Sequence, residues 1–201
     1  MPVTDLPATD TDLTAKARIR NAALELFAAH GESGVSLRAV AAHAGVAVGL
    51  VQHHFKTKEG LRAAVEQQIV EYHAQAIAGV PDDGPPPEVA SARDAAVRQM
   101  LARHPAVVDY LRRSFLDPGG SDLLIRLTEL GRSEVVRLRA AQLASTERAE
   151  SDQVIGLMVR QMGTLFLQPL IDAMWEHLRG PDAPSDEKPQ LSVTTAPGRA
   201  R

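Results

Sequence analysis

The sequence predicts an all-α fold of about nine helices, with an N-terminal three-helix domain that contains a helix-turn-helix and a C-terminal helical bundle. Hydrophobic residues make up 44% of the 201 residues but aromatic residues only 3%, so alanine, leucine and valine must supply the core. Alanine and leucine favour helix, and apolar residues recur at helical spacing along much of the chain. No run of alternating apolar and polar residues indicates a β-strand.

Composition and the first residues narrow the class of protein further. Charged residues make up 23% of the chain, an ordinary balance for a soluble globular protein. Cysteine is absent, which excludes a disulfide framework and thiolate metal ligands. Residues 1–12 lack the basic and apolar regions of a signal peptide, and no apolar run is long enough to span a bilayer. We expect a cytoplasmic protein whose residues 1–12 form a disordered tail.

The first helix is expected over residues 13–30 and ends at Gly31. One apolar face follows helical spacing and consists of Ile19, Ala22, Ala23, Leu26 and Phe27. Three basic residues lie near the start of this helix, namely Lys16, Arg18 and Arg20. Each of them either contacts a phosphate or belongs to a solvated surface, and the sequence favours neither interpretation.

Residues 37–56 indicate two short helices joined by a tight turn. Ser36 is a good N-cap for the first helix, because its hydroxyl accepts a hydrogen bond from an otherwise unpaired backbone N–H. Gly45 tolerates the left-handed conformation of a helix exit, and Ala41 is small enough for a close helix crossing. This pattern is typical of a helix-turn-helix, whose second helix, here about residues 47–54, enters the DNA major groove. A plain packing corner can have the same shape.

A candidate phosphate site lies at the start of the next helix, expected over residues 58–78. Thr57 is a suitable N-cap, and backbone N–H groups at a helix start attract anions. Lys56 and Lys58 add positive charge beside them. The chain carries a net charge of −3, yet residues 13–62 hold seven basic and three acidic side chains. The basic excess therefore falls on the segment that would meet DNA.

Prolines and glycines in residues 79–87 form the clearest break in the chain. Further helices are expected over residues 87–104, 106–116, 122–143, 152–167 and 169–178. Ser121 and Ser151 are expected N-caps. Pro169 either kinks one long helix or begins the last one.

The N-terminal motifs combine into one longer pattern, which consists of Ile19, Ala22, Ala23, Leu26, Phe27, Gly31, Val35, Ser36, Leu37, Arg38, Ala41, Ala44, Gly45, Val46, Gly49, His54, Phe55, Lys56, Thr57, Lys58, Glu59 and Leu61. Over about residues 13–62 this pattern resembles the N-terminal domain of TetR-type transcriptional regulators. The resemblance implies a homodimer, usually a repressor, that binds a pseudo-palindromic operator in double-stranded DNA and is released by a small hydrophobic molecule. It implies a DNA-binding domain over residues 13–57, a ligand-binding and dimerisation domain over residues 58–179, and a flexible tail over residues 180–201.

Carried over by position, the resemblance assigns DNA contacts to Ser36, Arg38, Ala47, Val48, Gly49, Leu50, Gln52, His53, Lys56 and Lys58. The chemistry is suitable, since arginine pairs with guanine and glutamine with adenine. Gly49 would permit close approach of the backbone to DNA. Many relatives have tyrosine in place of Gln52, and lysine or threonine in place of Val48 or Leu50. The surface of Val48, Gly49 and Leu50 is apolar and would contact thymine methyl groups, unless Leu50 belongs to the core.

A ligand pocket is expected inside the C-terminal bundle, because bundle cores commonly host such sites. The candidate wall residues are Met100, Leu101, Tyr110, Leu111, Phe115, Leu124, Leu127, Met158, Gln161, Met162 and Phe166. Tyr110 and Gln161 are the polar groups that would orient a ligand. For each apolar residue in this set the alternative is a plain core position.

The last two expected helices are apolar almost all round, so they must be buried on two sides. One side would face the core of the same chain and the other a second copy. The expected homodimer interface consists of Val154, Leu157, Leu165, Leu170, Met174 and Trp175.

We expect no metal site, no cofactor and no enzymatic activity. The adjacent His53 and His54 point about 100° apart on a helix and cannot easily share a metal. No nucleophile elbow surrounds Ser114, and no glycine-rich phosphate loop is present. The alternative function is an all-α small-molecule binding protein whose N-terminal helix corner is purely structural.

Overall fold

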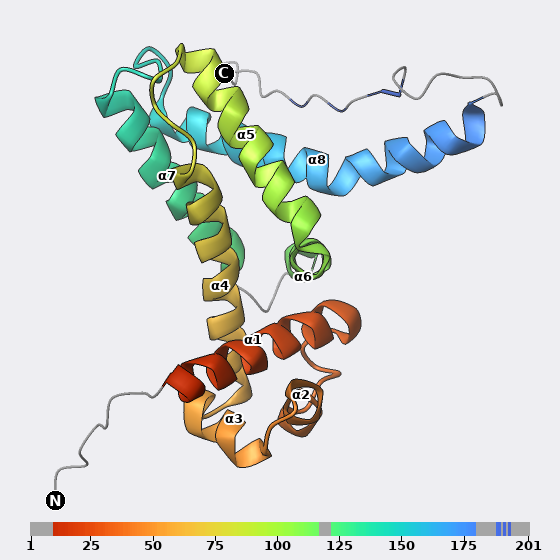
Figure 1. Ribbon diagram of the computed structural model, residues 1–201. Coiled ribbons are helices and arrows are strands. Elements are labelled where there is room, and N and C mark those ends of the chain that lie inside the picture. Colours follow the sequence, from red (N-terminus) through yellow and green to blue (C-terminus); the bar gives the residue numbers. More distant parts are fainter. Residues whose placement is uncertain (1–9, 117–121, 180–187, 190, 192, 194–201) are drawn as a thin grey trace, which may run out of the picture. The chain divides into compact units, whose positions relative to one another are not determined.

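The computed structural model describes residues 10–116, 122–179, 188, 189, 191 and 193. Every regular element within these residues is an α-helix, which confirms the all-α prediction (Figure 1). In chain order the helices are α1 (Asp10–His30), α2 (Leu37–Ala44), α3 (Val48–Phe55), α4 (Lys58–Ala78), α5 (Pro86–Arg103), α6 (Pro105–Leu116), α7 (Leu123–Ala140) and α8 (Glu150–Leu178). Ser121 and most of the two expected tails lie outside the described residues.

The described helices number eight rather than about nine, because α8 continues without a break through Pro169. Proline removes one hydrogen bond of a helix, but its neighbours Gln168 and Leu170 are good helix formers. The prediction of Ser151 as the N-cap of this helix was wrong. The N-cap is Ala149, so Ser151 already lies inside the helix, and no side chain caps this end.

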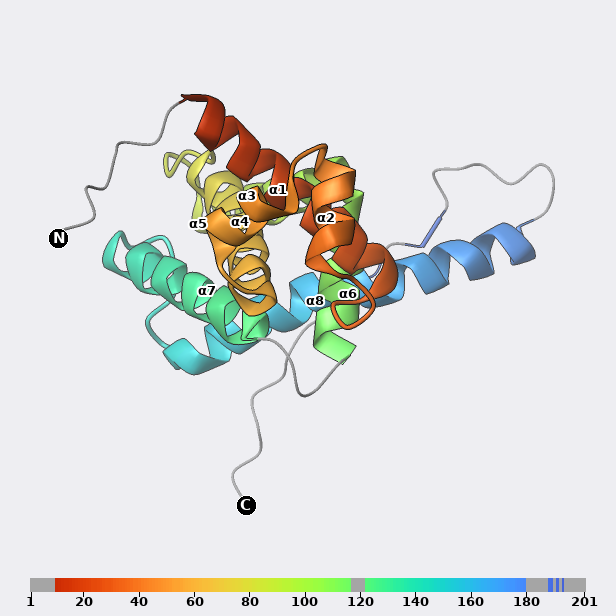
Figure 2. The same cartoon turned by 90° about the horizontal axis from the view of Figure 1, so that it is seen from below.

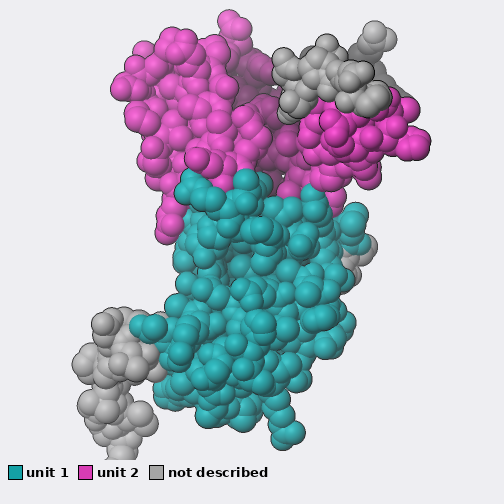
Figure 3. Space-filling model, turned by 45° about the vertical axis from the view of Figure 1, so that its right-hand side comes forward, with its two compact units in different colours: residues 1–72, 101–117 teal, residues 73–100, 118–201 magenta. Residues whose placement is uncertain are grey.

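The chain divides into two compact units (Figure 3). The first unit contains the described residues 10–72 and 101–116, and the second contains residues 73–100 and 122–179. This division differs from the boundary expected near residue 58, because α4 extends the core of the first unit as far as Tyr72 and α6 packs on α1.

The core of the first unit is built from one face of each of its helices. Ile19 and Phe27 on α1, Val40 on α2 and Val51 on α3 are all fully buried. On α4 the stripe Leu61, Val65 and Ile69 repeats every four residues and is also fully buried. A hydrogen bond of 2.7 Å between His43 Nε2 and Glu25 Oε2 links the end of α2 to α1.

The second unit has its core between α7 and the first half of α8 (Figures 1 and 2). Leu123, Leu127 and Val135 on α7 are buried, as are Val154 and Met158 on α8. The two helices pack closely at Gly131, where a Cβ atom would be at ordinary contact distance, 3.4 Å from Leu157 Cδ2 and 3.6 Å from Met158 Sδ.

The second half of α8 leaves large apolar side chains uncovered, with Leu170 58% exposed and Met174 55% exposed. By length and composition alone, α8 is the one described helix that is long and apolar enough to cross a bilayer. The expectation that no apolar run is long enough to span a bilayer is therefore wrong by length and composition, although core helices of soluble proteins share both properties. Exposed apolar surfaces of this kind are typical of faces that bind another molecule.

Candidate functional site

The turn between α2 and α3 has the geometry that the sequence predicts. Ser36 is in extended conformation, and its Oγ accepts a hydrogen bond of 3.1 Å from the backbone N–H of Ala39, which confirms the predicted N-cap. At the other end of α2, Gly45 has φ 65° and ψ 40°. The N–H of Val46 donates to the Ala41 carbonyl at 2.9 Å, and that of Gly45 donates to the Ala42 carbonyl at 3.2 Å. This pair of bonds is the Schellman ending, which fixes the exit of the chain toward α3.

The helix α3 is held by one face and exposes the other. Val51 and Phe55, four residues apart, are buried in the first unit. The opposite face carries Val48, Gly49, Gln52 and His53, all of which are exposed. This arrangement presents a helix with two polar side chains to an external partner, as a recognition helix does.

Gly49 lies in the middle of that exposed face. A Cβ atom built on it would meet nothing within 4 Å, so packing inside the protein does not require glycine here. Glycine inside a helix makes the helix less stable than alanine would at the same position. A reason outside the chain, such as close approach of a DNA backbone, would account for the residue.

The junction between α3 and α4 is tightly fixed. Lys56 has a positive φ of 63°, and the N–H of Thr57 donates to the Phe55 carbonyl at 2.7 Å. Thr57 Oγ1 accepts a hydrogen bond of 3.0 Å from the N–H of Gly60, which confirms the predicted cap of α4. A Cβ atom on Gly60 would lie 2.2 Å from the Phe55 carbonyl oxygen, so only glycine fits. The junction thus holds Lys56 and Lys58 beside the start of α4.

The start of α4 favours negative charge. The pKa of Glu59 is lowered, first by a hydrogen bond with its own backbone N–H and then by the hydroxyl of Thr57. Free N–H groups at a helix start stabilise an anion in this way. Lys56 is exposed and Lys58 is half-buried beside this position, so a phosphate would meet both N–H donors and ammonium groups.

The ten residues predicted to contact DNA lie on the start of α2, on α3 and at the α3–α4 junction. Eight of them are exposed, and the half-buried ones are Leu50 and Lys58. All ten belong to the first unit. Leu50 is therefore neither fully in the core nor fully on the surface.

The segment around this turn matches the model of a known family, described as "Bacterial regulatory proteins, tetR family", over residues 19–65. Residues 19–65 thus form a TetR-type N-terminal domain. Proteins with this domain are DNA-binding regulators of transcription and not enzymes, and they typically bind operators as dimers and respond to small molecules.

A sequence relative from Mycobacterium tuberculosis, the HTH-type transcriptional regulatory protein RaaS, is 58% identical over 60 residues. Those residues are 30% of this chain and only 28% of the length of RaaS. The likeness is therefore confined to less than a third of each chain, and the remainder of the two proteins is not matched.

Solved structures share the fold over most of the chain. A TetR transcriptional regulator from Chloroflexus aurantiacus J-10-FL has a TM-score of 0.65 and 18% identity, with 84% of this chain and 92% of that chain covered. A transcriptional regulator from Rhodococcus sp. Rha1 has a TM-score of 0.60 and 23% identity, with 80% and 86% covered. The chain thus has the fold of TetR-type regulators beyond the N-terminal domain.

A cavity of about 270 Å³ lies in the second unit, between the end of α4, α5, α7 and α8. Of the eleven residues predicted to line a pocket, Gln161 lines this cavity. Leu101, Tyr110, Leu111 and Phe115 belong to the first unit instead. There the Tyr110 hydroxyl donates a hydrogen bond of 3.3 Å to Glu66 Oε1, and burial raises its pKa.

The other six predicted pocket residues belong to the second unit but do not line this cavity. The buried ones are Met100, Leu127 and Met158, whereas Leu124 is exposed and Met162 and Phe166 are half-buried. Long apolar side chains thus fill the core of the unit, and the cavity wall is more polar than the sequence suggested.

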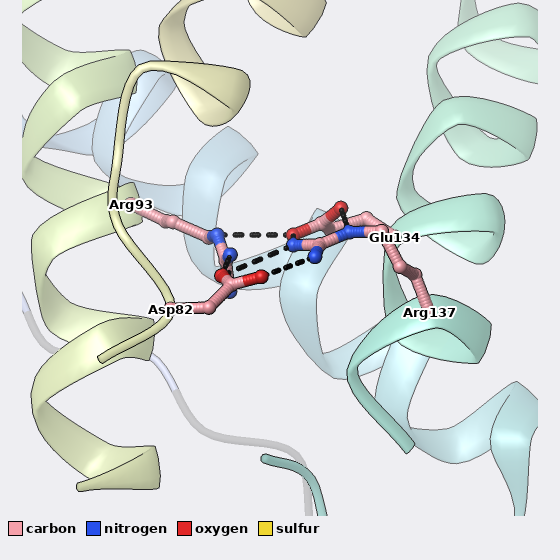
Figure 4. A network of polar contacts seen from close by, with 4 residues as sticks. All are labelled: Asp82, Arg93, Glu134 and Arg137. Atoms are coloured by element: carbon pink, nitrogen blue, oxygen red, sulfur yellow. Dashed lines mark hydrogen bonds and ion pairs between the residues drawn. The ribbon is translucent and has the colours of Figure 1, made fainter. Parts of the chain in front are cut away.

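The polar part of the cavity wall was missed by sequence reasoning. Arg93 Nη2 hydrogen-bonds Asp82 Oδ1, and Arg93 Nε lies 3.0 Å from Glu134 Oε1 (Figure 4). Arg137 contacts the same two carboxylates, with Nη2 2.9 Å from Glu134 Oε1. The guanidinium groups of Arg137 and Arg93 lower the pKa of Asp82.

A signal for this network was present in the sequence. Val89, Arg93, Val97 and Met100 follow one helical stripe of α5, and all four are buried. An arginine in an apolar stripe must find partners for its charge, because a buried unpaired charge is costly. Its position among three apolar residues therefore marks Arg93 as a buried polar group.

Proposed function

We propose that this chain is a transcriptional repressor that binds a pseudo-palindromic operator as a homodimer and is released by a small hydrophobic molecule. The observation that carries the proposal is the exposed face of α3, held by a capped and fixed turn in a TetR-type domain. The 58% identity to RaaS over 60 residues supports a role in transcription regulation.

The proposed DNA contacts follow from the exposed chemistry of the first unit. Arg38 would pair with a guanine edge and Gln52 with an adenine edge, since both side chains are exposed and suit those bases. Lys56 and the N–H groups at the start of α4 would hold a backbone phosphate. In a dimer, the two α3 helices would enter successive major grooves, about 34 Å apart.

The proposed dimer interface is the second half of α8. Leu170 and Met174 are exposed, and Leu165 and Trp175 are half-buried. Val154 is already buried inside its own unit, and Leu157 contacts the Gly131 position of α7. A second copy of the chain would therefore cover mainly the C-terminal residues of α8.

The proposed effector site is the cavity of the second unit. Bundles commonly bind small molecules between facing helices. Apolar residues such as Leu138 and Leu157 share the wall with Gln161 and Arg93. Because the DNA partner is chromosomal, a cytoplasmic location is part of the same proposal.

The DNA-binding proposal is tested by fluorescence anisotropy with DNA from around the protein's own gene, at several salt concentrations. We expect sequence-selective binding whose affinity falls steeply with salt. The changes Arg38→Ala and Gln52→Ala should each weaken specific binding about tenfold, which corresponds to the loss of a good base contact. Matched controls are Arg98→Ala and Gln99→Ala on α5, since both side chains are exposed in the second unit.

An absence of selective DNA binding, with small-molecule binding intact, would instead identify a binding protein whose helix-turn-helix is only structural. Equal effects of the α5 control changes and the α2 and α3 changes would also contradict the assignment of the recognition surface.

A further inference from the structure

Arg93 is the most deeply buried charged side chain on the wall of the cavity in the second unit, with 6% of the residue exposed. It projects from α5 to Asp82 in the α4–α5 connection and to Glu134 on α7 (Figure 4). Arginine has five N–H donors in a planar fork. The question is which of these donors the protein itself uses.

The hydrogen bonds of Arg93 are incomplete. Nη2 donates to Asp82 Oδ1. Nε lies within ion-pair distance of Glu134 Oε1 but lacks the alignment of a hydrogen bond. Nη1 is buried and has no hydrogen-bond partner among the described residues. Buried donors are nearly always satisfied in folded proteins, so an unpaired donor on a side chain that lines a cavity points to an acceptor that the chain does not supply.

The charges around the cavity are balanced. Its wall includes Arg93, Arg148 and Arg160 and three carboxylates, from Asp94, Glu134 and Asp152. Arg160 Nε is paired with Asp94 Oδ2 at 2.7 Å, and Arg93 with Glu134 and Asp82. A bound anion or cation would disturb this balance of paired charges, whereas a neutral group would not.

The size of the cavity bounds the ligand. Pockets for drug-sized molecules range from about 300 to 1,000 Å³. The cavity here is about 270 Å³ and has apolar walls from Leu138, Val135 and Leu157. It suits a compact, mostly apolar molecule.

We propose that the effector is an uncharged, mostly apolar molecule with a carbonyl oxygen that accepts a hydrogen bond from Arg93 Nη1. This inference rests on the proposed function, because it specifies the chemistry of the effector. The carbonyl gives Nη1 an acceptor without adding charge. Arg93 also joins α5 to Asp82 and Glu134, so the ligand contacts a residue that ties the α4–α5 connection to α7.

The test compares three small probes on the full chain by isothermal titration calorimetry. Acetophenone carries a carbonyl, α-methylstyrene replaces that oxygen with a methylene group of similar shape, and benzoate replaces it with a carboxylate. We expect acetophenone to bind at least about tenfold more tightly than either of the others, as one hydrogen bond to a charged donor would produce.

Two variants separate a ligand contact from a purely structural role. Arg93→Lys keeps the charge but loses the fork, and should reduce the preference for acetophenone over α-methylstyrene to about twofold or less. Arg137→Lys is the matched control, because Arg137 shares Asp82 and Glu134 but does not line this cavity. It should leave the preference unchanged. If Arg93→Lys does not fold, the probe ratio of the unmodified chain decides the question alone.

Equal binding of the ketone and the alkene, tighter binding of benzoate, or no binding of any probe would overturn the inference. An equal loss in both variants would also overturn it, since the network would then act only structurally. DNA binding without any ligand is measured separately. If DNA binding fails while the preference for the carbonyl probe is present, the proposed regulator is contradicted. If DNA binding is present while that preference is missing, only the proposed effector chemistry is contradicted.

Discussion

Arg113 on α6 donates a hydrogen bond of 3.2 Å from Nε to the carbonyl oxygen of Ala28 on α1. Its Nη2 donates to the Ala29 carbonyl at 3.1 Å. The last carbonyl groups of a helix have no partner within the helix and carry partial negative charge. A side chain that is 84 residues further along the chain therefore caps the end of α1, next to Gly31, which has φ 75°.

Replacement of Arg113 by alanine should destabilise the first unit by about 1 kcal/mol, since two partly solvated bonds to carbonyl groups are lost. Urea denaturation followed by circular dichroism measures the change. Arg103→Ala is the matched control, because Arg103 is an exposed arginine of the same unit. A similar loss in both variants would show that the cap does not contribute.

Gly49→Ala should separate stability from DNA binding. Alanine favours helix over glycine by about 1 kcal/mol, and open space surrounds the Cβ position, so the melting temperature should stay the same or rise. On the proposed interface the added methyl group meets DNA, and affinity should fall about tenfold. Thermal melting and anisotropy on the same sample check both effects. Unchanged DNA affinity would contradict the placement of α3 in the major groove.

Stability of the second unit should fall as the solution becomes acidic, through Asp82. The neighbouring guanidinium groups lower the pKa of Asp82 in the folded protein below its unfolded value. The stabilisation is therefore complete above the unfolded pKa, near 3.9, and is lost as pH falls through the lower folded pKa. Urea unfolding between pH 6 and pH 3 should show a shallower dependence for Asp82→Asn. The exposed neighbour Asp83 supplies the control Asp83→Asn, which should retain the slope of the unmodified chain.

Features that depend on local sequence were predictable. The caps at Ser36 and Thr57 and the left-handed Gly45 each involve residues no more than five positions apart, so local chemistry determines them. The buried face of α1 follows from helical periodicity in the same way. The local geometry of the turn could therefore be predicted from the sequence, whereas the proposed DNA contacts rest on the resemblance to TetR-type regulators.

Features that depend on distant contacts were not predictable in detail. Whether a helix continues through Pro169 depends on the balance between one lost hydrogen bond and the residues on both sides. The assignment of Tyr110 to a pocket rested on its polarity, but Glu66, 44 residues away, provides its partner. The spacing of α5 marks Arg93 as buried, but its partners lie 11 and 41 positions away, and no local spacing identifies them.

The dimer proposal leads to the last prediction. Leu170 and Met174 lie one helical turn apart on α8, both more than half exposed, and would be covered by a second copy of the chain. A buried glutamate without a partner is costly, so Leu170→Glu or Met174→Glu should convert a dimer into a monomer at micromolar concentration. Light scattering coupled to size-exclusion chromatography measures the mass.

Val136→Glu on α7 is the control for that experiment, because Val136 is also an exposed apolar residue of the second unit, at 47% exposure. It should leave the mass of the dimer unchanged. The monomeric variants should retain their helix content, since neither side chain belongs to the core of one protomer. They should also lose most of their affinity for a two-site operator. In a dimer, binding of the first half-site brings the second DNA-binding domain close to the second half-site, and separate monomers lack this advantage. A monomeric unmodified chain would contradict the dimer. A dimer that only Val136→Glu dissociates would place the interface elsewhere.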